Sequence, residues 1–258
     1  MGLKACLGKA LNSVLKRYDY EIVSSSRLQW KNAEQQLEQV FEGIEATQMV
    51  LSSTARYGGV SLYELFVICA VARHIKAQRI FEIGTYEGNT TLNLALNTEP
   101  GAAIFTLDLP NALMAQQSDP EIVNQYSNGV VVGRRFEGEL VATKIKQLWG
   151  DSLVFDFGPF LNSMDLVFID GNHAYRYVKS DTRNALRILS RRNQGRACIV
   201  WHDCHYDSEV KEVLEEVLHG RYHRIAQTWL AIYISGSEVL PGELEQADFD
   251  KESPKEKN

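Results

Sequence analysis

Two clusters of polar side chains follow two strand-like apolar runs, and their residue types are those that move protons or bind metal ions. The first cluster follows the run at 166–169, and the second follows the run at 198–201. Their members are Asp170, Asn172 and His173, then His202, Asp203, Cys204 and His205. Because the carboxyl ends of parallel strands meet at one edge of a sheet, we expect both clusters to converge on one cleft.

Two kinds of catalytic site would use the acidic and imidazole groups of these clusters. A magnesium or manganese ion prefers hard oxygen ligands, which Asp170 and Asp203 supply, with His202 as a third ligand. A metal-free site would instead use His173 as a general base, since an unperturbed imidazole has a pKa of about 6.5. The residues alone leave both chemistries open.

A zinc site from His202, Cys204 and His205 is a third interpretation. Side chains alternate along a strand, so His202 and Cys204 would share one face while Asp203 takes the other, unless the strand has already ended. Alternation therefore disfavours zinc. The purely structural alternative is that these strand-end polar groups cap the helices that follow.

The loop after the apolar run at 79–83 has the features of a nucleoside-binding turn. Gly84 and Gly88 give the spacing G-x-x-x-G. Tyr86 occupies the position where dinucleotide enzymes need a second glycine, which lets the backbone approach a pyrophosphate. The sequence therefore favours a nucleoside without a diphosphate and disfavours a nicotinamide oxidoreductase.

Polar residues stand at the ends of the next two expected strands. Asp108 lies 24 residues after Gly84, where a carboxylate accepts hydrogen bonds from both ribose hydroxyls. Asp151 and Ser152 follow the run at 145–149, within reach of an adenine amino group. Each feature alone is common in α/β proteins, but together, at successive strand ends, they indicate a nucleoside site.

A mostly parallel sheet is needed to position these residues. Seven runs are expected as strands: 79–83, 103–107, 145–149, 166–169, 198–201, 223–228 and 230–234. The first five are near-continuous hydrophobic runs or are separated by helix-length segments, as in parallel strands buried on both faces. The last two nearly abut, which predicts an antiparallel hairpin at one edge. We therefore expect an α/β fold with helices on both faces of the sheet.

Helix starts can also be predicted from the sequence. Ser61 and Glu64 fit a capping box, in which the serine accepts from the glutamate's amide and the glutamate reaches back, so a helix should run from Ser61 to about His74. Asn89 or Thr90 should open the helix that follows the glycine loop.

Three zones divide the chain. Residues 1–60 carry leucines at helical spacing among basic residues, which predicts a helical extension that packs on its own domain or on a second subunit, with a membrane surface as the alternative. Residues 61–240 are expected to form the main domain. Residues 241–258 are acidic, lack apolar periodicity and are expected to be disordered.

Composition excludes several classes of protein. Of 258 residues 45% are hydrophobic and 23% charged, which is typical of a globular chain. The net charge of −6 lacks the basic excess of a nucleic-acid-binding protein. The longest largely apolar run, 62–75, is interrupted by charged residues and is too short to span a bilayer. Four cysteines without disulfide spacing and the absence of a secretory signal predict a cytoplasmic protein.

Five segments together resemble the class I S-adenosylmethionine-dependent methyltransferases: 82–88, 106–108, 150–152, 168–173 and 200–203. They are most similar to the small-molecule O-methyltransferases, the branch with catechol O-methyltransferase-like and antibiotic-sugar enzymes. The likeness covers residues 60 to about 235 and implies a Rossmann-like fold. It also implies that the methionine end of the cofactor is lined by Glu82, Gly84, Tyr86, Gly88 and Thr90, the ribose by Asp108, and the adenine by Asp151 and Ser152.

The sequence thus predicts methylation of a hydroxyl on a small acceptor, such as a sugar or glycoside. An alcohol is a very weak acid, so we expect Mg²⁺ or Mn²⁺, held by Asp170, Asp203 and His202, to stabilise the alkoxide. His173 is expected to act as base or to orient the acceptor, with Asp170 beside it as a catalytic residue. The alternative is a non-catalytic cofactor-binding or assembly protein of the same fold. Besides the acceptor, the expected partner is a second copy of this chain, which would form a homo-oligomer through the N-terminal helices.

Overall fold

The computed structural model describes residues 34–44, 59–110, 130–191, 197–205 and 208–236. The predicted tail at 241–258 and most of the predicted extension at 1–60 lie outside these residues. The domain boundaries therefore stay predictions.

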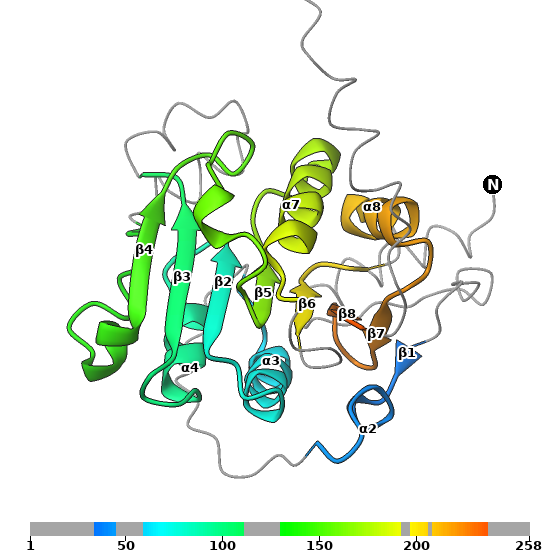
Figure 1. The fold of residues 1–258 in the computed structure, drawn as a ribbon, viewed down its shortest axis with the longest axis horizontal. Helices are drawn as coiled ribbons and strands as arrows, with labels where there is room; N and C mark the ends of the chain where they lie inside the picture. Colours follow the sequence, from blue (N-terminus) through cyan, green and yellow to red (C-terminus); the bar gives the residue numbers. More distant parts are fainter. Residues whose placement is uncertain (1–33, 45–58, 111–129, 192–196, 206–207, 237–258) are drawn as a thin grey trace, which may run out of the picture. The chain divides into compact units, whose positions relative to one another are not determined.

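A mixed sheet forms the centre of the described residues (Figure 1). Its order is β1-β7-β8-β6-β5-β2-β3-β4, and β8 runs antiparallel to both of its neighbours. The seven expected strands are all present, which confirms the Rossmann-like α/β fold. Their bounds are β2 Arg79–Ile83, β3 Ala103–Asp108, β4 Ile145–Trp149, β5 Leu166–Ile169, β6 Cys198–Trp201, β7 His223–Ile225 and β8 Ala231–Ile234.

The edge beyond the predicted hairpin differs in detail from the sequence prediction. Strand β1, Glu34–Gln35, adds two residues parallel to β7, in a segment where only helix was expected. The strand expected at 223–228 ends at Ile225, because the chain turns there: Thr228 Oγ1 donates to the Ile225 carbonyl at 2.8 Å, and Gln227 has a φ of +63°. The antiparallel pairing of β7 with β8 is confirmed.

Helices cover both faces of the sheet. They are α2 Leu37–Val40, α3 Leu62–His74, α4 Asn89–Leu96, α7 Tyr175–Ile188 and α8 Glu209–Leu218, with single 3₁₀ turns η3 at Leu140–Lys144 and η4 at Gly158–Phe160. The capping box of α3 is confirmed, with Ser61 Oγ accepting from Glu64 N at 3.3 Å and Glu64 Oε2 accepting from Ser61 N at 3.0 Å. Helix α4 begins at Asn89, as expected.

Alternation along the strands assigns each helix layer to a face. Ile80 and Val200 belong to the hydrophobic core that includes the buried side of α3. The next residue along each strand points to the opposite face. There Trp201 donates from Nε1 to Thr182 Oγ1 of α7 at 3.0 Å, and the Phe81 ring contacts the Phe160 ring. Two separate cores therefore fix the sheet, and the polar strand ends project beyond them.

Within the described part of the chain, none of the helices is long and apolar enough to cross a membrane. This agrees with the expectation from the run at 62–75.

Candidate functional site

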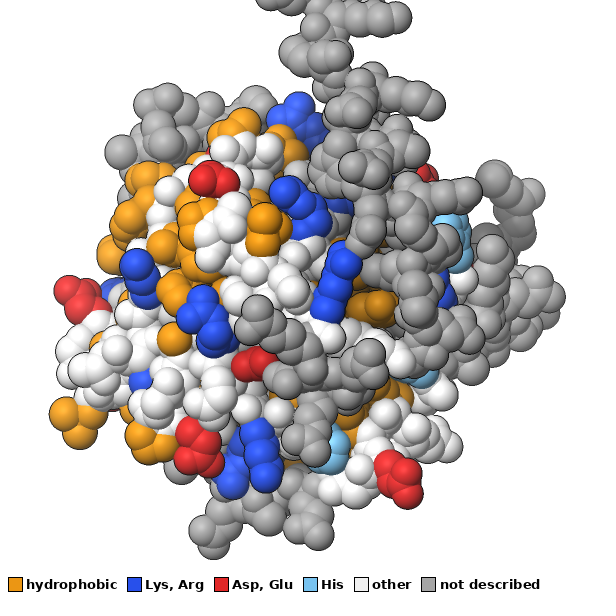
Figure 2. Space-filling view, viewed as in Figure 1, with side chains coloured by type: hydrophobic (Ala, Val, Ile, Leu, Met, Phe, Trp, Pro, Cys, Tyr) orange, Lys and Arg blue, Asp and Glu red, His pale blue; other side chains and the backbone are white. Residues whose placement is uncertain are grey.

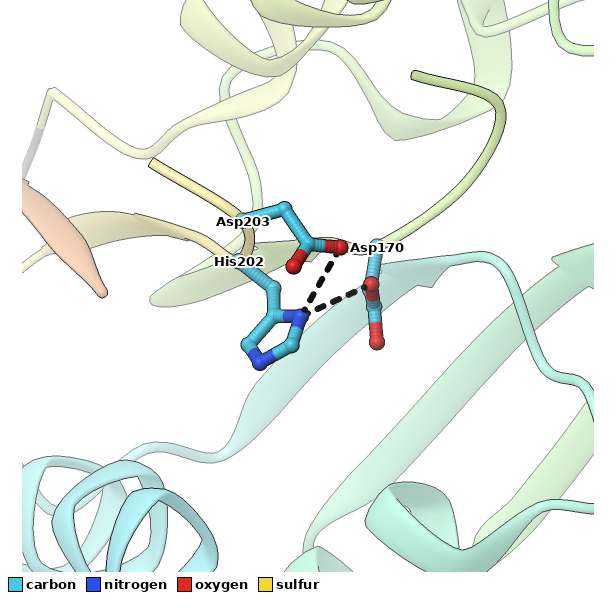
Figure 3. A group of neighbouring side chains, drawn as sticks. All are labelled: Asp170, His202 and Asp203. Carbon is cyan, nitrogen blue, oxygen red and sulfur yellow. Dashed lines mark ion pairs between the residues drawn. The ribbon is translucent and has the colours of Figure 1, made fainter. Parts of the chain in front are cut away.

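Three side chains that follow β5 and β6 converge on one point (Figure 3). Strands β5 and β6 are parallel neighbours with Ile169 opposite Trp201, so the residues after them are adjacent. His202 Nδ1 lies 3.3 Å from Asp170 Oδ1 and 3.2 Å from Asp203 Oδ2. The structure thus brings together the three residues that were predicted as metal ligands.

The end of β6 explains why two consecutive residues reach the same point. The strand stops at Trp201, and Asp203 adopts a left-handed φ of +55°, a conformation that aspartate tolerates better than most residues. Strand alternation therefore no longer applies after Trp201. His202 and Asp203 can both face Asp170.

The zinc interpretation finds no support among the described residues. Their one group of His, Cys, Asp and Glu side chains with the spacing of a metal site is Asp170, His202 and Asp203. Cys204 is buried, its N–H donates to the Trp229 carbonyl at 2.9 Å, and burial raises the pKa of its thiol to about 12. His205 packs its ring against the indole of Trp229 instead.

The donor set fits a hard divalent cation. His202 is 7% exposed, and its Nδ1 has no hydrogen-bond partner although carboxylate oxygens lie on two sides of it. Its Nε2 is 3.3 Å from Glu64 Oε2 and donates to it. An imidazole engaged through Nε2–H keeps the Nδ1 lone pair free, so the group offers one nitrogen and two carboxylates to Mg²⁺ or Mn²⁺.

Three carboxylates surround the imidazole of His202, and their negative charge favours a positive charge at this position. Burial alone would lower the pKa of His202, but Asp170, Asp203 and Glu64 raise it well above its ordinary value. Burial would likewise raise the pKa of Asp170, but His202 and His173 hold it well below its usual range. A proton on His202 and a bound cation would therefore compete for the same negative surroundings.

His173 stands at the solvent side of this group. Its Nε2 is 3.0 Å from Asp203 Oδ2 and 3.7 Å from Asp170 Oδ1, and its side chain is 54% exposed. Burial opposes a rise in its pKa, but the two carboxylates outweigh that effect and raise it. Asn172, by contrast, stabilises the turn before α7, since its Oδ1 accepts from Ala174 N at 2.9 Å.

Glu64 is a member of the site that sequence reasoning did not identify. It was predicted only as the acid of a capping box, and the structure adds the contact with His202. Burial favours a higher pKa, yet the hydrogen bonds and charge of His202, with backbone N–H groups, lower the pKa of Glu64 to about 2. The one signal in the sequence was an acid in the first turn of a largely apolar helix.

The glycine loop touches the loop after β5 directly. Gly84 has a φ of +95°, and a Cβ at this position would lie 2.0 Å from the Asp170 carbonyl oxygen. Gly88 has a φ of +84° at the start of α4, and a Cβ there would lie 2.6 Å from the Phe136 ring. Both glycines are therefore required by the protein's own packing, whatever the loop binds.

Asp108 holds the same loop from the end of β3. Its Oδ2 accepts from Thr85 N at 3.0 Å and from Tyr86 N at 2.7 Å, and its Oδ1 accepts from Leu109 N at 2.7 Å. Burial raises the pKa of Asp108 in spite of these three amide donors. Oδ2 already accepts from two amides, while Oδ1 keeps one accepting site for a ligand hydroxyl.

Glu82 lies in β2, just before the glycine loop. It is 1% exposed, and its Oε2 accepts from Thr106 Oγ1 at 2.6 Å and from Thr91 Oγ1. Burial raises its pKa to about 8. Thr90, in the first turn of α4, is also buried. Glu82 therefore joins β3 and α4, the two elements beside the loop.

Asp151 and Ser152 form a turn after β4 that faces α7. Asp151 Oδ2 accepts from the Tyr177 hydroxyl at 3.2 Å and its Oδ1 from Leu153 N at 3.0 Å. Ser152 is half-buried in the same turn. This turn and Asp108 lie at the ends of adjacent strands, as the predicted nucleoside site requires.

The segment at residues 133–135 also holds the glycine loop through hydrogen bonds, and no sequence motif predicted this contact. Gly133 N donates to the Tyr86 carbonyl, and Arg135 N donates to the Glu87 carbonyl, both at 2.9 Å. The Arg135 guanidinium also donates twice to Glu87 Oε2, at 3.2 and 3.3 Å. Glu87 is buried, so this pair fixes the loop.

A hollow of about 640 Å³ lies beside β4 and is lined largely by apolar side chains, among them Val131, Phe136, Ile145 and Trp149. Figure 2 shows hydrophobic side chains gathered at this edge, on the left of the view. None of the predicted site residues lines the hollow.

Comparison with known proteins places these features in a family context. Residues 81–204 match the profile of a family described as "Methyltransferase domain". An O-methyltransferase from Bacillus cereus, solved in complex with SAH, is similar in fold at 15% identity and a TM-score of 0.50, over 88% of this chain and 97% of that chain.

Two further solved structures are similar at lower TM-scores. The O-methyltransferase TomG from Streptomyces achromogenes, involved in tomaymycin synthesis and solved with SAM, has 20% identity and a TM-score of 0.46 over 89% of this chain and 99% of its own. A putative caffeoyl-CoA O-methyltransferase from Staphylococcus aureus has 14% identity and a TM-score of 0.46 over 90% and 100%. A search of the curated proteins gave no match.

Proposed function

Since the domain at residues 81–204 and the Rossmann-like sheet make this chain a class I S-adenosylmethionine-dependent methyltransferase, we propose that it methylates a hydroxyl oxygen of a small molecule with the help of a divalent cation. The observation that carries the proposal is the group formed by Asp170, His202 and Asp203. Its buried Nδ1 atom lacks a hydrogen-bond partner and faces two carboxylates, which is the donor chemistry of a magnesium or manganese site.

The chemistry required of the protein is mainly to position and deprotonate the acceptor. When bound, S-adenosylmethionine would supply an already activated methyl group, so the chain's own residues must hold the acceptor oxygen in line with it. When bound, a divalent cation supplies positive charge that favours the alkoxide form of the acceptor. His173, 3.0 Å from Asp203 and exposed on the solvent side, is the residue we assign to take the acceptor's proton as a neutral imidazole or to orient the hydroxyl, with Asp170 beside it.

The cofactor is assigned to the ends of β2, β3 and β4. Asp108, whose Oδ1 keeps one accepting site, binds the ribose, and the turn of Asp151 and Ser152 binds the adenine. The loop and the start of α4 bind the methionine end, through Gly84, Tyr86, Gly88 and Thr90. Glu82 is assigned to the same end and joins β3 to α4 through Thr106 and Thr91. Gly84, after β2, lies directly against the backbone of Asp170, after β5. A methyl donor bound at the glycine loop would therefore lie next to the cation site.

The acceptor class we propose is a small hydroxylated compound such as a sugar or glycoside. The test is a turnover assay with a panel of sugars, glycosides and catechols. Mass spectrometry detects the two products, S-adenosylhomocysteine and a methyl ether. Product should form with Mg²⁺, stop in excess chelator and return when Mg²⁺ is restored. Full activity in chelator would contradict the role of the cation. Cofactor binding without turnover of any acceptor in Mg²⁺ would favour the alternative, a non-catalytic cofactor-binding protein.

A further inference from the structure

We propose that Glu64 is the positioning residue of the cation site: it holds the His202 ring so that an unprotonated Nδ1 faces the cation. This inference rests on the proposed function, because it assumes a cation between Asp170, His202 and Asp203. It adds a residue outside the strand ends, in the first turn of α3, to the machinery of the site.

The contact between Glu64 and His202 is enclosed by protein. Both side chains are buried, at 8% exposure for Glu64 and 7% for His202, and Nε2 lies 3.3 Å from Oε2. A carboxylate only accepts hydrogen bonds, so the contact with Glu64 keeps a hydrogen on Nε2. A cation that displaces the proton from the side of Asp170 and Asp203 then finds the lone pair on Nδ1. Nδ1 is the atom that lies within 3.3 Å of both Asp170 and Asp203. The tautomer selected by Glu64 is therefore the one that can bind a metal on the correct side of the ring.

Backbone donors fix the Glu64 carboxylate independently of the histidine. Oε2 accepts from Ser61 N at 3.0 Å, and Oε1 accepts from Trp229 N at 2.8 Å. These donors come from two parts of the fold, the turn before α3 and the turn between β7 and β8. Because both oxygens are held by backbone N–H groups, the carboxylate cannot rotate away from His202 without losing a hydrogen bond. The orientation of the imidazole thus follows from the fold.

Trp229 strengthens the connection to the ligand loop. Its carbonyl accepts from Cys204 N at 2.9 Å, one residue after Asp203, while its own N–H donates to Glu64. Glu64 and the loop that carries Asp203 are therefore joined through one residue. A change at Glu64 should affect the geometry of the metal ligands more than that of the cofactor loop.

A role limited to helix capping is the competing explanation, and the same capping box offers a matched control. Ser61→Ala removes the Oγ that accepts from Glu64 N at 3.3 Å, but it leaves the backbone N–H of residue 61 and the contact with His202 in place. Glu64→Gln keeps the length of the side chain and can still accept from one backbone amide, but it no longer offers a carboxylate to His202.

The first test is calorimetric titration of Mn²⁺ into the full chain in the presence of SAH. Glu64→Gln should weaken Mn²⁺ binding by roughly 10- to 100-fold, the usual effect of losing such a partner of a metal-bound histidine. Its affinity for SAH should stay within about twofold of that of the wild type. Ser61→Ala should lower the melting temperature without changing Mn²⁺ affinity. Equal Mn²⁺ affinity in wild type and Glu64→Gln would overturn the inference, while a wild type that binds no Mn²⁺ would overturn the proposed cation and this inference with it.

The second test needs no variant and decides the matter if Glu64→Gln does not fold. Long-range proton–nitrogen correlation spectra of the Mg²⁺-loaded, histidine-labelled wild type report which nitrogen of His202 carries the hydrogen. We expect the Nε2–H tautomer. An Nδ1–H tautomer in the Mg²⁺-loaded protein would overturn the inference.

Discussion

Asp108 offers a prediction whose size can be worked out from its contacts. Asp108→Ala removes the acceptor of three backbone N–H groups, those of Thr85, Tyr86 and Leu109. A hydrogen bond to a charged acceptor contributes about 1.5–3 kcal/mol, but Asp108 is half-buried and water replaces part of each bond. We therefore expect the free energy of unfolding to fall by about 2–4 kcal/mol, which is less than the sum of three such bonds.

The same substitution should weaken the cofactor through both the loop and the ribose. We expect a loss of about 2–3 kcal/mol, or roughly 30- to 150-fold in the dissociation constant of SAH. Asp108→Asn should be milder in both respects, because its carbonyl oxygen can still accept from Thr85 and Tyr86 while its amide group faces the Leu109 N–H.

Urea unfolding and calorimetry with SAH measure the two effects separately on the same preparations. A loss of cofactor affinity in Asp108→Asn with unchanged stability would identify the ribose contact as the main role. An alanine variant that is as stable as the wild type and binds SAH as tightly would refute both the loop contacts and the ribose assignment.

Three further predictions follow from the site. Gly84→Ala should lower the free energy of unfolding by more than about 3 kcal/mol, since its Cβ would lie 2.0 Å from the Asp170 carbonyl, whereas Gly138→Ala, with a φ of +78° but open space, should lose only about 1 kcal/mol in urea unfolding; equal losses would contradict the close approach. The pKa of Glu82 is raised from 4.5 to about 8, so the stability linked to its proton is fully present below pH 4.5 and is lost as the pH rises through about 8. The free energy of unfolding should therefore fall by roughly 2 kcal/mol more in wild type than in Glu82→Gln between pH 6 and pH 8, and parallel pH profiles would show that Glu82 is ionised in the folded protein. Asp170→Asn should lower the methylation rate at least about 100-fold in steady-state assays and leave SAH affinity within a few fold, while an unchanged rate would remove Asp170 from the mechanism.

The buried part of the fold could be predicted from the sequence because its physical signals are local. Strands such as Leu166–Ile169 and Cys198–Trp201 are buried on both faces and therefore read as continuous apolar runs. The start of α3 depends on Ser61 and Glu64, which are three positions apart, so its capping box could also be predicted from the sequence. Strand β1 has two residues and no pattern of its own, and only its pairing with β7 makes it a strand.

For the candidate site, the sequence predicted which strand ends lie together but not how the side chains after them are arranged. That Asp170, His202 and Asp203 converge follows from the adjacency of β5 and β6. The left-handed backbone at Asp203, which allows two consecutive side chains to face Asp170, has no signature in the sequence. The contact of Glu64 with His202 joins residues 138 positions apart, and no local rule connects them.

The position of a bound cation tests the account most directly. Anomalous diffraction at the manganese absorption edge, from crystals of the full chain grown with Mn²⁺ and SAH, would locate the ion without reference to activity. We predict one strong peak held by carboxylate oxygens of Asp170 and Asp203 and by Nδ1 of His202. Crystals that contain SAH but show no peak among these three side chains, or a peak held by other residues, would contradict the account.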